Sequence, residues 1–134
     1  METDTLIRVL FTGSRDHQNP QFVIDTIKSF LKYYQVEELV FVHGDCPNRP
    51  SNIAKGMSVD QIAKRFANIY GIKEEAHPAN WNEFGKAAGF IRNQAMVDLG
   101  ADVCLAFPFG KSNGTRHCAK QADKAGIEVR MYEA

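Results

Sequence analysis

The chain has 134 residues, of which 44% are hydrophobic and 24% are charged. These values are typical of one globular domain with a buried core, and they exclude a disordered or fibrous protein. The formal net charge is zero, with 16 basic and 16 acidic residues. A protein that binds long nucleic acid mainly through phosphates usually carries a basic excess, so nucleic acid is not the favoured partner. Zero net charge also leaves little self-repulsion, which favours a homo-oligomer.

The start of the chain and its thiols indicate a cytoplasmic protein. Met1–Thr5 is polar and acidic, and it lacks the basic start and apolar stretch of a secretory signal. The longest apolar runs have the length of strands, so we expect no membrane span. The three cysteines, Cys46, Cys104 and Cys118, lack the even number and tight spacing of a disulfide framework, which fits a reducing compartment.

In the first half of the chain, strand and helix patterns alternate. The β-rich run at 7–11 predicts a strand, and Pro20 opens a segment with helical spacing of apolar residues. Residues 39–42 are apolar throughout, as in a buried parallel strand. The polar stretch 45–57 predicts a long loop. Ser58 is a good N-cap for the next helix, which Gly71 ends.

The second half continues the alternation. We expect a weaker strand at 72–77, followed by a helix from about 82 to 99 that is broken around 85–89. A strong strand at 101–107 then leads into a glycine-containing loop at 108–115. A helix to 125 and a closing strand at 127–131 complete the chain. This order predicts a single α/β domain over 1–134. Short links between alternating strands and helices predict a Rossmann-like three-layer fold with a mainly parallel sheet of about five strands.

In such a sheet, ligands bind beyond the carboxyl ends of the strands. Three polar loops fall at these ends, at 12–16, 43–46 and 108–115. The third is the best anion site, because glycines let backbone amides approach a phosphate at a helix N-terminus, and Ser112 and Thr115 add hydroxyls. It lacks the full phosphate-loop pattern, so a plain strand-to-helix turn is the alternative.

Two arginines are candidates for holding an anion. Arg15 could bind phosphate in a bidentate manner, or it could pair with Asp16 or simply face water. Arg92 lies in an otherwise apolar context and therefore needs a ligand or a carboxylate, the latter from Asp60, Glu83 or Asp98. Asp60 itself falls in the first turn of its helix, where it could accept ribose hydroxyls or complement the helix dipole.

Other chemistry is weakly indicated. His43, Cys46, His117 and Cys118 do not have the spacing of a standard zinc site, so we expect no metal and no cofactor. Cys46 could be a nucleophile, but spacing identifies no basic partner for it. Trp81 could stack on a base or pack against the domain.

Taken in order, the loops resemble a known family. The motifs are FTGSRD at 11–16, VHGDCP at 42–47, GMSVDQIA at 56–63, HPANW at 77–81, GKAAGFIRNQAMVDLGADVCLAFPFG at 85–110, NGT at 113–115 and the final AGIEV. Over nearly the whole chain they are similar to the small SLOG-fold proteins of the YspA, cpYpsA-related group, the DUF2493 family, which occur in phage and bacterial genomes.

The resemblance implies a Rossmann-like fold and a pocket for a nucleotide derivative. Members of the wider superfamily include phosphoribohydrolases, a DNA-processing protein that acts on single strands, and sensors of ADP-ribose-type signals. Together, the loop pattern and the matching family motifs nominate as ligand-binding residues Gly13, Ser14, Arg15, His43, Gly44, Asp60, Arg92, Asn93, Pro108, Gly110, Ser112, Gly114 and Thr115.

The sequence departs from the resemblance in two places, and the first departure weakens the hypothesis of a phosphoribohydrolase activity. Phosphoribohydrolases carry a glutamate shortly after the glycine-threonine pair, whereas here Thr115 precedes Arg116, His117 and Cys118. Residues 48–55 are also extra; they could form a lid, a partner contact or a neutral insertion.

Three hypotheses remain from the sequence. The leading one is binding or sensing of a nucleotide-derived, ADP-ribose-like small molecule. The second is an enzyme that hydrolyses the N-glycosidic bond of a nucleotide, with Arg92 and Asp60 as candidate catalytic residues. The third is a single-strand nucleic-acid binder.

Overall fold

The computed structural model describes residues 6–134, so the polar segment Met1–Thr5 lies outside the described residues. The strands are β1 (Ile7–Gly13), β2 (Leu39–His43), β3 (Lys73–Ala76), β4 (Val103–Phe107) and β5 (Glu128–Met131). The helices are α1 (Pro20–Leu31), α2 (Val59–Tyr70), α3 (Trp81–Phe84), α4 (Ala88–Asp98) and α5 (Asn113–Lys124), with 3-10 turns η1 (Val36–Glu38) and η2 (Gly85–Ala87). Within the described part, no helix has both the length and the hydropathy that a membrane span requires.

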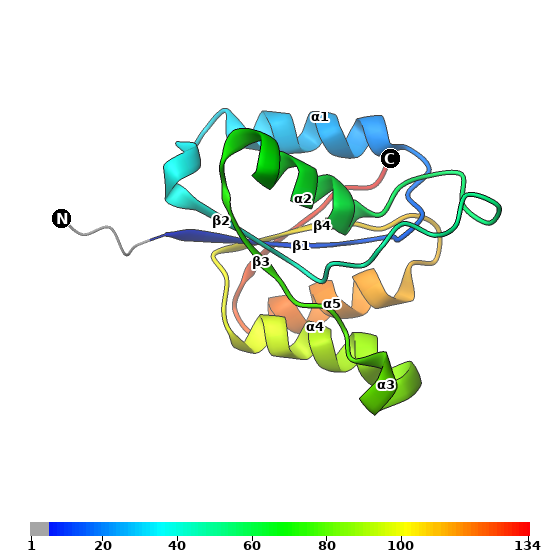
Figure 1. Cartoon of the computed structure of the whole chain (residues 1–134). Helices are drawn as coiled ribbons and strands as arrows, with labels where there is room; N and C mark the ends of the chain where they lie inside the picture. Colours follow the sequence, from blue (N-terminus) through cyan, green and yellow to red (C-terminus); the bar gives the residue numbers. More distant parts are fainter. Residues whose placement is uncertain (1–5) are drawn as a thin grey trace.

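The sheet has five parallel strands in the order β3-β2-β1-β4-β5. Helices α1 and α2 cover one face and α4 and α5 cover the other (Figure 1). The predicted three-layer α/β fold is therefore confirmed. The chain winds outward from β1 in both directions, so the strand order reverses between β1 and β4. This is the position at which a crevice opens at the carboxyl ends of the strands.

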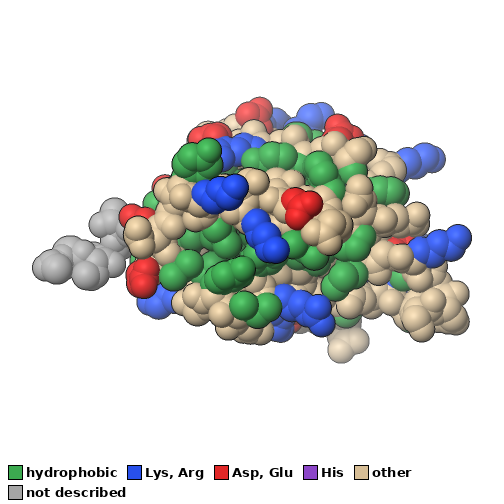
Figure 2. Space-filling view, turned by 90° about the horizontal axis from the view of Figure 1, so that it is seen from above, with side chains coloured by type: hydrophobic (Ala, Val, Ile, Leu, Met, Phe, Trp, Pro, Cys, Tyr) green, Lys and Arg blue, Asp and Glu red, His purple; other side chains and the backbone are tan. Residues whose placement is uncertain are grey.

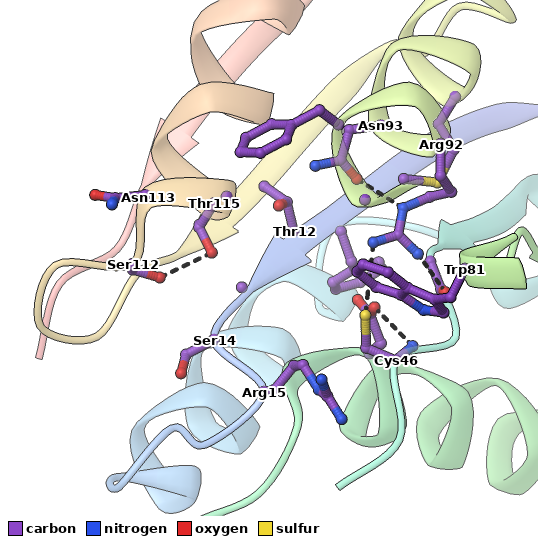
Figure 3. Close-up of a pocket in the computed structure, with 18 of the residues that line it drawn as sticks. Thr12, Ser14, Arg15, Cys46, Trp81, Arg92, Asn93, Ser112, Asn113 and Thr115 are labelled. Carbon is purple, nitrogen blue, oxygen red and sulfur yellow. Dashed lines mark hydrogen bonds between the residues drawn. The ribbon is translucent and has the colours of Figure 1, made fainter. Parts of the chain in front are cut away.

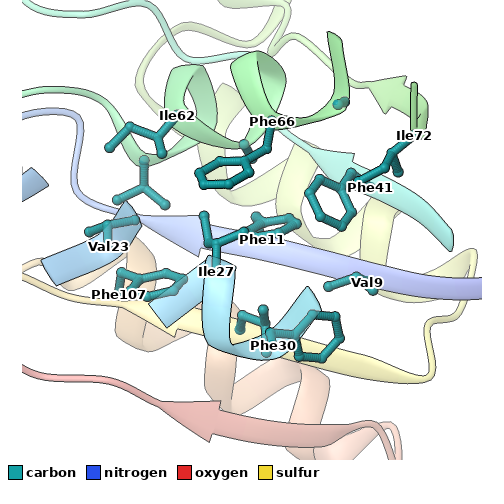
Figure 4. Close-up of a cluster of buried hydrophobic side chains, with 14 of the residues drawn as sticks. Val9, Phe11, Val23, Ile27, Phe30, Phe41, Ile62, Phe66, Ile72 and Phe107 are labelled. Carbon is teal, nitrogen blue, oxygen red and sulfur yellow. The ribbon is translucent and has the colours of Figure 1, made fainter. Parts of the chain in front are cut away.

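The core lies on both faces of the central strands. On the face of α1 and α2, Phe11 and Phe41 pack edge-on with ring centroids 4.6 Å apart (Figure 4). The preceding residue in β1, Leu10, points to the opposite face and packs in a second cluster with Met96 and Cys104. Because β1, β2 and β4 are buried on both sides, the loops at their ends rest on a rigid base.

The helical segments agree with the sequence expectation in one respect and differ in two. The helix expected over 82–99 is interrupted as predicted, because Gly85 has φ of 56° and separates α3 from η2 and α4. It begins one residue earlier, at Trp81, where the Asn80 side chain accepts the amide of Glu83. The 3-10 turn η1 was not predicted, because three residues are too few to show a hydrophobic period.

The long loop at 45–57 is fixed to the segment after β1. The amide of His17 donates to the Met57 carbonyl at 2.9 Å, and the Met57 amide donates to the His17 carbonyl at 3.0 Å. Asp16 accepts the amides of Lys55 and Gly56. Gly56 is needed here, because a Cβ at this position would lie 1.9 Å from the His17 carbonyl oxygen. The loop is thus an ordered wall beside β1.

Candidate functional site

A cavity of about 320 Å³ opens at the carboxyl ends of β1 and β4, between the N-termini of α2 and α5 and the side of α4 (Figure 3). Its size is within the range of small-molecule sites. Its lining comes from segments far apart in the sequence: Phe11 to Arg15, Gly44, Cys46, Arg49, Asp60, Trp81, Lys86, Gly89, Phe90, Arg92, Asn93, Met96 and Ser112 to Thr115.

The N-terminus of α5 forms one wall. Its N-cap, Ser112, does not cap the helix with its side chain, but donates its hydroxyl to Thr115 Oγ1 at 2.9 Å. The first-turn amides of α5 therefore have no side-chain cap, and a helix N-terminus carries partial positive charge. Ser112 also has φ of 44°, which is unusual for a residue other than glycine. A Cβ added to Gly114 would meet nothing within 4 Å, so this end of the helix is open.

The end of β1 forms the floor. The Ser14 amide donates to the Phe107 carbonyl at 3.3 Å, which ties this loop to the end of β4. Ser14 also accepts the Val59 amide through its carbonyl at 3.0 Å. A Cβ on Gly13 would come within 2.4 Å of Val59 Cγ2. Gly13 therefore lets α2 approach β1 closely, which brings the first turn of α2 into the cavity.

Arg92 reaches across from α4 to the ends of β2 and β3. Its Nη1 donates to the Gly44 carbonyl at 2.6 Å and to the His77 carbonyl at 3.3 Å, and its Nε donates to Asn93 Oδ1 at 2.7 Å. Its Nη2 lies 3.5 Å from Cys46 Sγ. A Cβ on Gly44 would come within 2.2 Å of Nη1, so the guanidinium packs directly on this glycine. These contacts fix Arg92 in the cavity wall.

Asp60 is the carboxylate of the site. It lies in the first turn of α2 and is buried, and its Oδ2 accepts the Cys46 amide at 3.1 Å. Burial raises the pKa of Asp60, against the opposing effects of the Cys46 amide, His43 and Arg92. Burial, followed by the Asp60 charge, also raises the pKa of the Cys46 thiol, which makes Cys46 a poor nucleophile at neutral pH.

The cavity gathers more basic than acidic side chains. Four basic side chains line it, and within residues 6–134 none of them has a carboxylate oxygen within 4.0 Å. Of the twelve other Lys and Arg side chains, four have such a partner within the described residues: Arg8 with Glu75, Lys64 with Asp45, Arg116 with Glu133 and Arg130 with Glu128. A chain with zero net charge thus carries a local excess of cations, from Arg15, Arg49, Lys86 and Arg92.

Aromatic side chains flank this charge. The Trp81 side chain extends from α3 over Arg92 and Cys46 (Figure 3), and Trp81 is 52% exposed. Phe90, on α4, is also partly exposed and contacts His117 edge-on. Gly89 lies between them in the lining, where a Cβ would be in ordinary contact with the Trp81 ring at 3.5 Å. The cavity therefore combines anion-binding groups with apolar rings that a planar base could contact.

The sequence can be compared with known proteins. No profile of a known protein family matches it. The chain is 44% identical over 127 residues to the Gene 61 protein of Mycobacterium phage D29, and the alignment covers 91% of this chain and 93% of that protein. The chain belongs to the family of this phage protein. The name of that phage protein states no chemistry, so the cavity is the feature of this chain that points to a function.

Ten of the thirteen residues nominated from the sequence line the cavity. The other three lie elsewhere. His43 is fully buried, where Nε2 lies 2.5 Å from Glu74 Oε2 and Nδ1 accepts the Asp45 amide. Pro108 is buried beneath the loop, and Gly110 forms an exposed turn with φ of 65°. These three residues shape the loops around the cavity.

Among the described residues, neither arginine forms the ion pair that the sequence allowed for it. Arg92 bonds backbone carbonyls instead of Asp60, Glu83 or Asp98. Arg15 does not pair with Asp16, whose carboxylate holds the 45–57 loop, and its only bond among described residues is a long one of 3.5 Å to the Pro47 carbonyl. Both arginines therefore keep their charge available to the cavity.

Sequence reasoning missed several lining residues, notably Arg49, Lys86 and Phe90. Arg49 belongs to residues 48–55, for which the sequence allows a lid, a partner contact or a neutral insertion. It faces the cavity because Asp16 fixes that loop. Lys86 lies in η2, within the helix break, and Phe90 lies in the first turn of α4 just after it. No periodicity reveals the direction that the chain takes there. The sequence signal that could have identified these lining residues is the pair of glycines, Gly85 and Gly89, that follows Trp81.

Proposed function

We propose that the chain binds a nucleotide-derived, phosphate-bearing small molecule, of the ADP-ribose-like class, at the carboxyl edge of its sheet. The observation that carries the proposal is the set of four basic side chains, unpaired with carboxylates in the described chain, around the uncapped N-terminus of α5. An anionic ligand would neutralise this charge and occupy the first-turn amides of the helix.

The rest of the cavity fits the other parts of a nucleotide. The exposed faces of Trp81 and Phe90 offer stacking surfaces for a base. Asp60 and Asn93 supply acceptors and donors for ribose hydroxyls. The resemblance to the SLOG group, although carried by sequence motifs alone, agrees with this division, since its glycine-serine-arginine and glycine-threonine motifs coincide with the floor and the α5 wall.

A small molecule fits the charge distribution better than a nucleic-acid strand. Four basic side chains line one cavity, and the face covered by α1 and α2 intersperses basic, acidic and apolar side chains (Figure 2). A strand needs cations spread along a groove, and its binding weakens steeply with salt. We therefore favour a confined ligand.

The binding test begins with mass spectrometry of small molecules released from the purified protein, followed by calorimetric titration with nucleotides. We expect Arg92→Ala to weaken binding by about 1.5–3 kcal/mol, the usual range for a charged hydrogen bond. Arg65→Ala, which removes an exposed arginine on α2 away from the cavity, is the matched control and should bind normally. Equal affinities of the Arg92→Ala and Arg65→Ala variants would contradict the assignment.

Gly44→Ala gives an independent check. Its Cβ would overlap the Arg92 guanidinium, so it should displace Arg92 without removing the charge. We expect the double variant to lose little more affinity than either single variant, because both act on the same group. Additive losses would show that Gly44 and Arg92 act separately.

A second candidate function is hydrolysis of an N-glycosidic bond. The observation in its favour is that the buried carboxyl of Asp60, with its raised pKa, lines the same cavity as the cations. A carboxyl with a raised pKa can serve as a general acid toward a departing base. Incubation with nucleoside monophosphates should then release free base, and Asp60→Asn should abolish the release while retaining binding. No release by the wild-type protein would leave binding as the function.

A further inference from the structure

Helix α4, in the outer layer of the fold (Figure 1), presents apolar side chains to solvent. Ala87, Ile91 and Ala95 are exposed and share one side of the helix, because each lies four residues from the next. Phe84 before the helix and Leu99 at its C-cap are also exposed, and Ile91 and Leu99 are 42% and 59% exposed. We call these five residues the α4 stripe. None of them lines the cavity.

The outer face of α4 lacks the charged side chains that a surface helix normally carries. Between Lys86 and Asp98 the sequence has one charged residue, Arg92, whose guanidinium turns inward to backbone carbonyls. The neighbouring helix α5, by contrast, exposes Lys120 and Lys124. A helix that is apolar both toward the sheet and away from it is typically covered on both sides. The α4 stripe is therefore a surface that favours a partner.

A groove runs beside the α4 stripe toward the edge strand β3. Its volume is about 330 Å³. Ala76 and Pro78 contribute apolar lining from the end of β3, and Phe84, Ile91 and Ala95 contribute it from the stripe. The surface thus offers a ridge of apolar side chains and, next to it, a hollow that an apolar side chain can enter.

The α4 stripe has the symmetry that a contact between two copies of one chain requires. Ala87 lies four residues before Ile91 and Ala95 lies four residues after it. Phe84 and Leu99 lie seven and eight residues away on the two sides. In a two-fold contact, each residue must find a partner at the mirrored position of the other copy. The zero net charge of the chain also leaves little repulsion between two copies.

We propose that the α4 stripe is the two-fold contact of a homodimer. Two α4 helices pack antiparallel with the axis at Ile91, so that Ile91 meets its own copy and Ala87 meets Ala95 of the second chain. The small alanine side chains let the helices approach closely. Leu99 of each copy enters the groove of the other beside Phe84. The contact uses no cavity residue, so it forms without ligand and is independent of the proposed nucleotide site.

The first test is sedimentation analysis of the full chain without ligand. At about 100 µM the wild-type protein should have twice the mass of one chain. Ile91→Glu places two carboxylates at the axis and should weaken dimerisation at least about 100-fold. Ile69→Glu makes the same change at an isoleucine of α2 that is 73% exposed, and it should stay within about twofold of the wild type. Circular dichroism verifies that both variants are folded.

The second test locates the axis. Two Ile91→Cys chains should form a disulfide-linked dimer on mild oxidation, because residues at a two-fold axis face each other. Ile69→Cys should give no more cross-link than the wild type, whose partly exposed Cys46 sets the background. A wild-type protein that is monomeric at about 100 µM overturns the proposal and leaves the stripe to a different partner. Equal dimerisation of Ile91→Glu and Ile69→Glu, or a dimer without the Ile91→Cys cross-link, overturns the placement of the contact.

Discussion

The N-termini of α2 and α5 both point at the cavity, and they are built in opposite ways. Ser58 caps α2, accepting the Gln61 amide through its hydroxyl and donating that hydroxyl to the Cys46 carbonyl at 2.7 Å. Asp60 then adds negative charge to the first turn. In contrast, α5 has no side-chain cap, no acidic residue in its first turn and a strained N-cap. One helix start is capped by a side chain, whereas the other leaves its first-turn amides without a side-chain partner.

The largest effect should come from removing the cap of α2. Ser58→Ala leaves the Gln61 amide without its side-chain partner and removes one of two donors to the Cys46 carbonyl, the other being Gln61 Nε2. We therefore expect the free energy of unfolding to fall by about 1–2 kcal/mol in urea denaturation. Ser112→Ala is the matched control at α5 and should cost clearly less, because Ser112 caps nothing. Equal losses would remove the contrast between the two helices.

The next effect concerns affinity. Gly114→Ala places a methyl group in open space in the free protein, and alanine favours helix, so stability should rise by about 0.5–1 kcal/mol. The same methyl group would stand before the α5 amides and should weaken nucleotide binding about tenfold. Calorimetry and thermal melting of the same sample separate the two effects. Unchanged affinity would mean that phosphate does not approach this turn.

A smaller effect is expected at the strained N-cap. Glycine adopts positive φ without steric cost, although it adds freedom to the unfolded chain. Ser112→Gly should therefore raise the free energy of unfolding by about 0.5 kcal/mol. A loss of stability would show that the hydroxyl bond to Thr115 outweighs the strain.

The smallest effect is a change in pH dependence at α2. Because the pKa of Asp60 is higher in the folded than in the unfolded state, this group binds more protons when folded, and its contribution to stability falls as the pH rises above its ordinary pKa. Asp60→Asn removes that contribution, so the variant should gain stability relative to the wild type between pH 4 and pH 7. Urea denaturation at both pH values measures this. A constant difference would contradict the raised pKa.

The sequence predicted the fold well because the fold depends on local patterns. Apolar runs at β1, β2 and β4 and the caps at Ser58 and Gly71 each specify one element, and alternation then restricts the topology. Ser58 is a clear case, since its type and its position before an apolar period predict the observed cap.

The site was predicted less completely because it depends on where side chains point. Whether Arg92 binds a carboxylate or a carbonyl follows from how closely α4 approaches the end of β2, and Gly44 sets that distance. His43 shares a motif with Gly44 yet turns to Glu74 on the neighbouring strand. Register between β2 and β3 brings that pair together, and no sequence pattern reveals it.

The pairing of β1 with β4 has a consequence for how the protein forms. These strands lie side by side in the sheet, with Val9 opposite Val103, although more than half of the chain separates them. Closing so long a segment is entropically costly and slows folding. The cavity spans that seam, since Ser14 is on one side and Thr115 on the other. A chain emerging from the ribosome therefore cannot form this cavity until its last third has been synthesised.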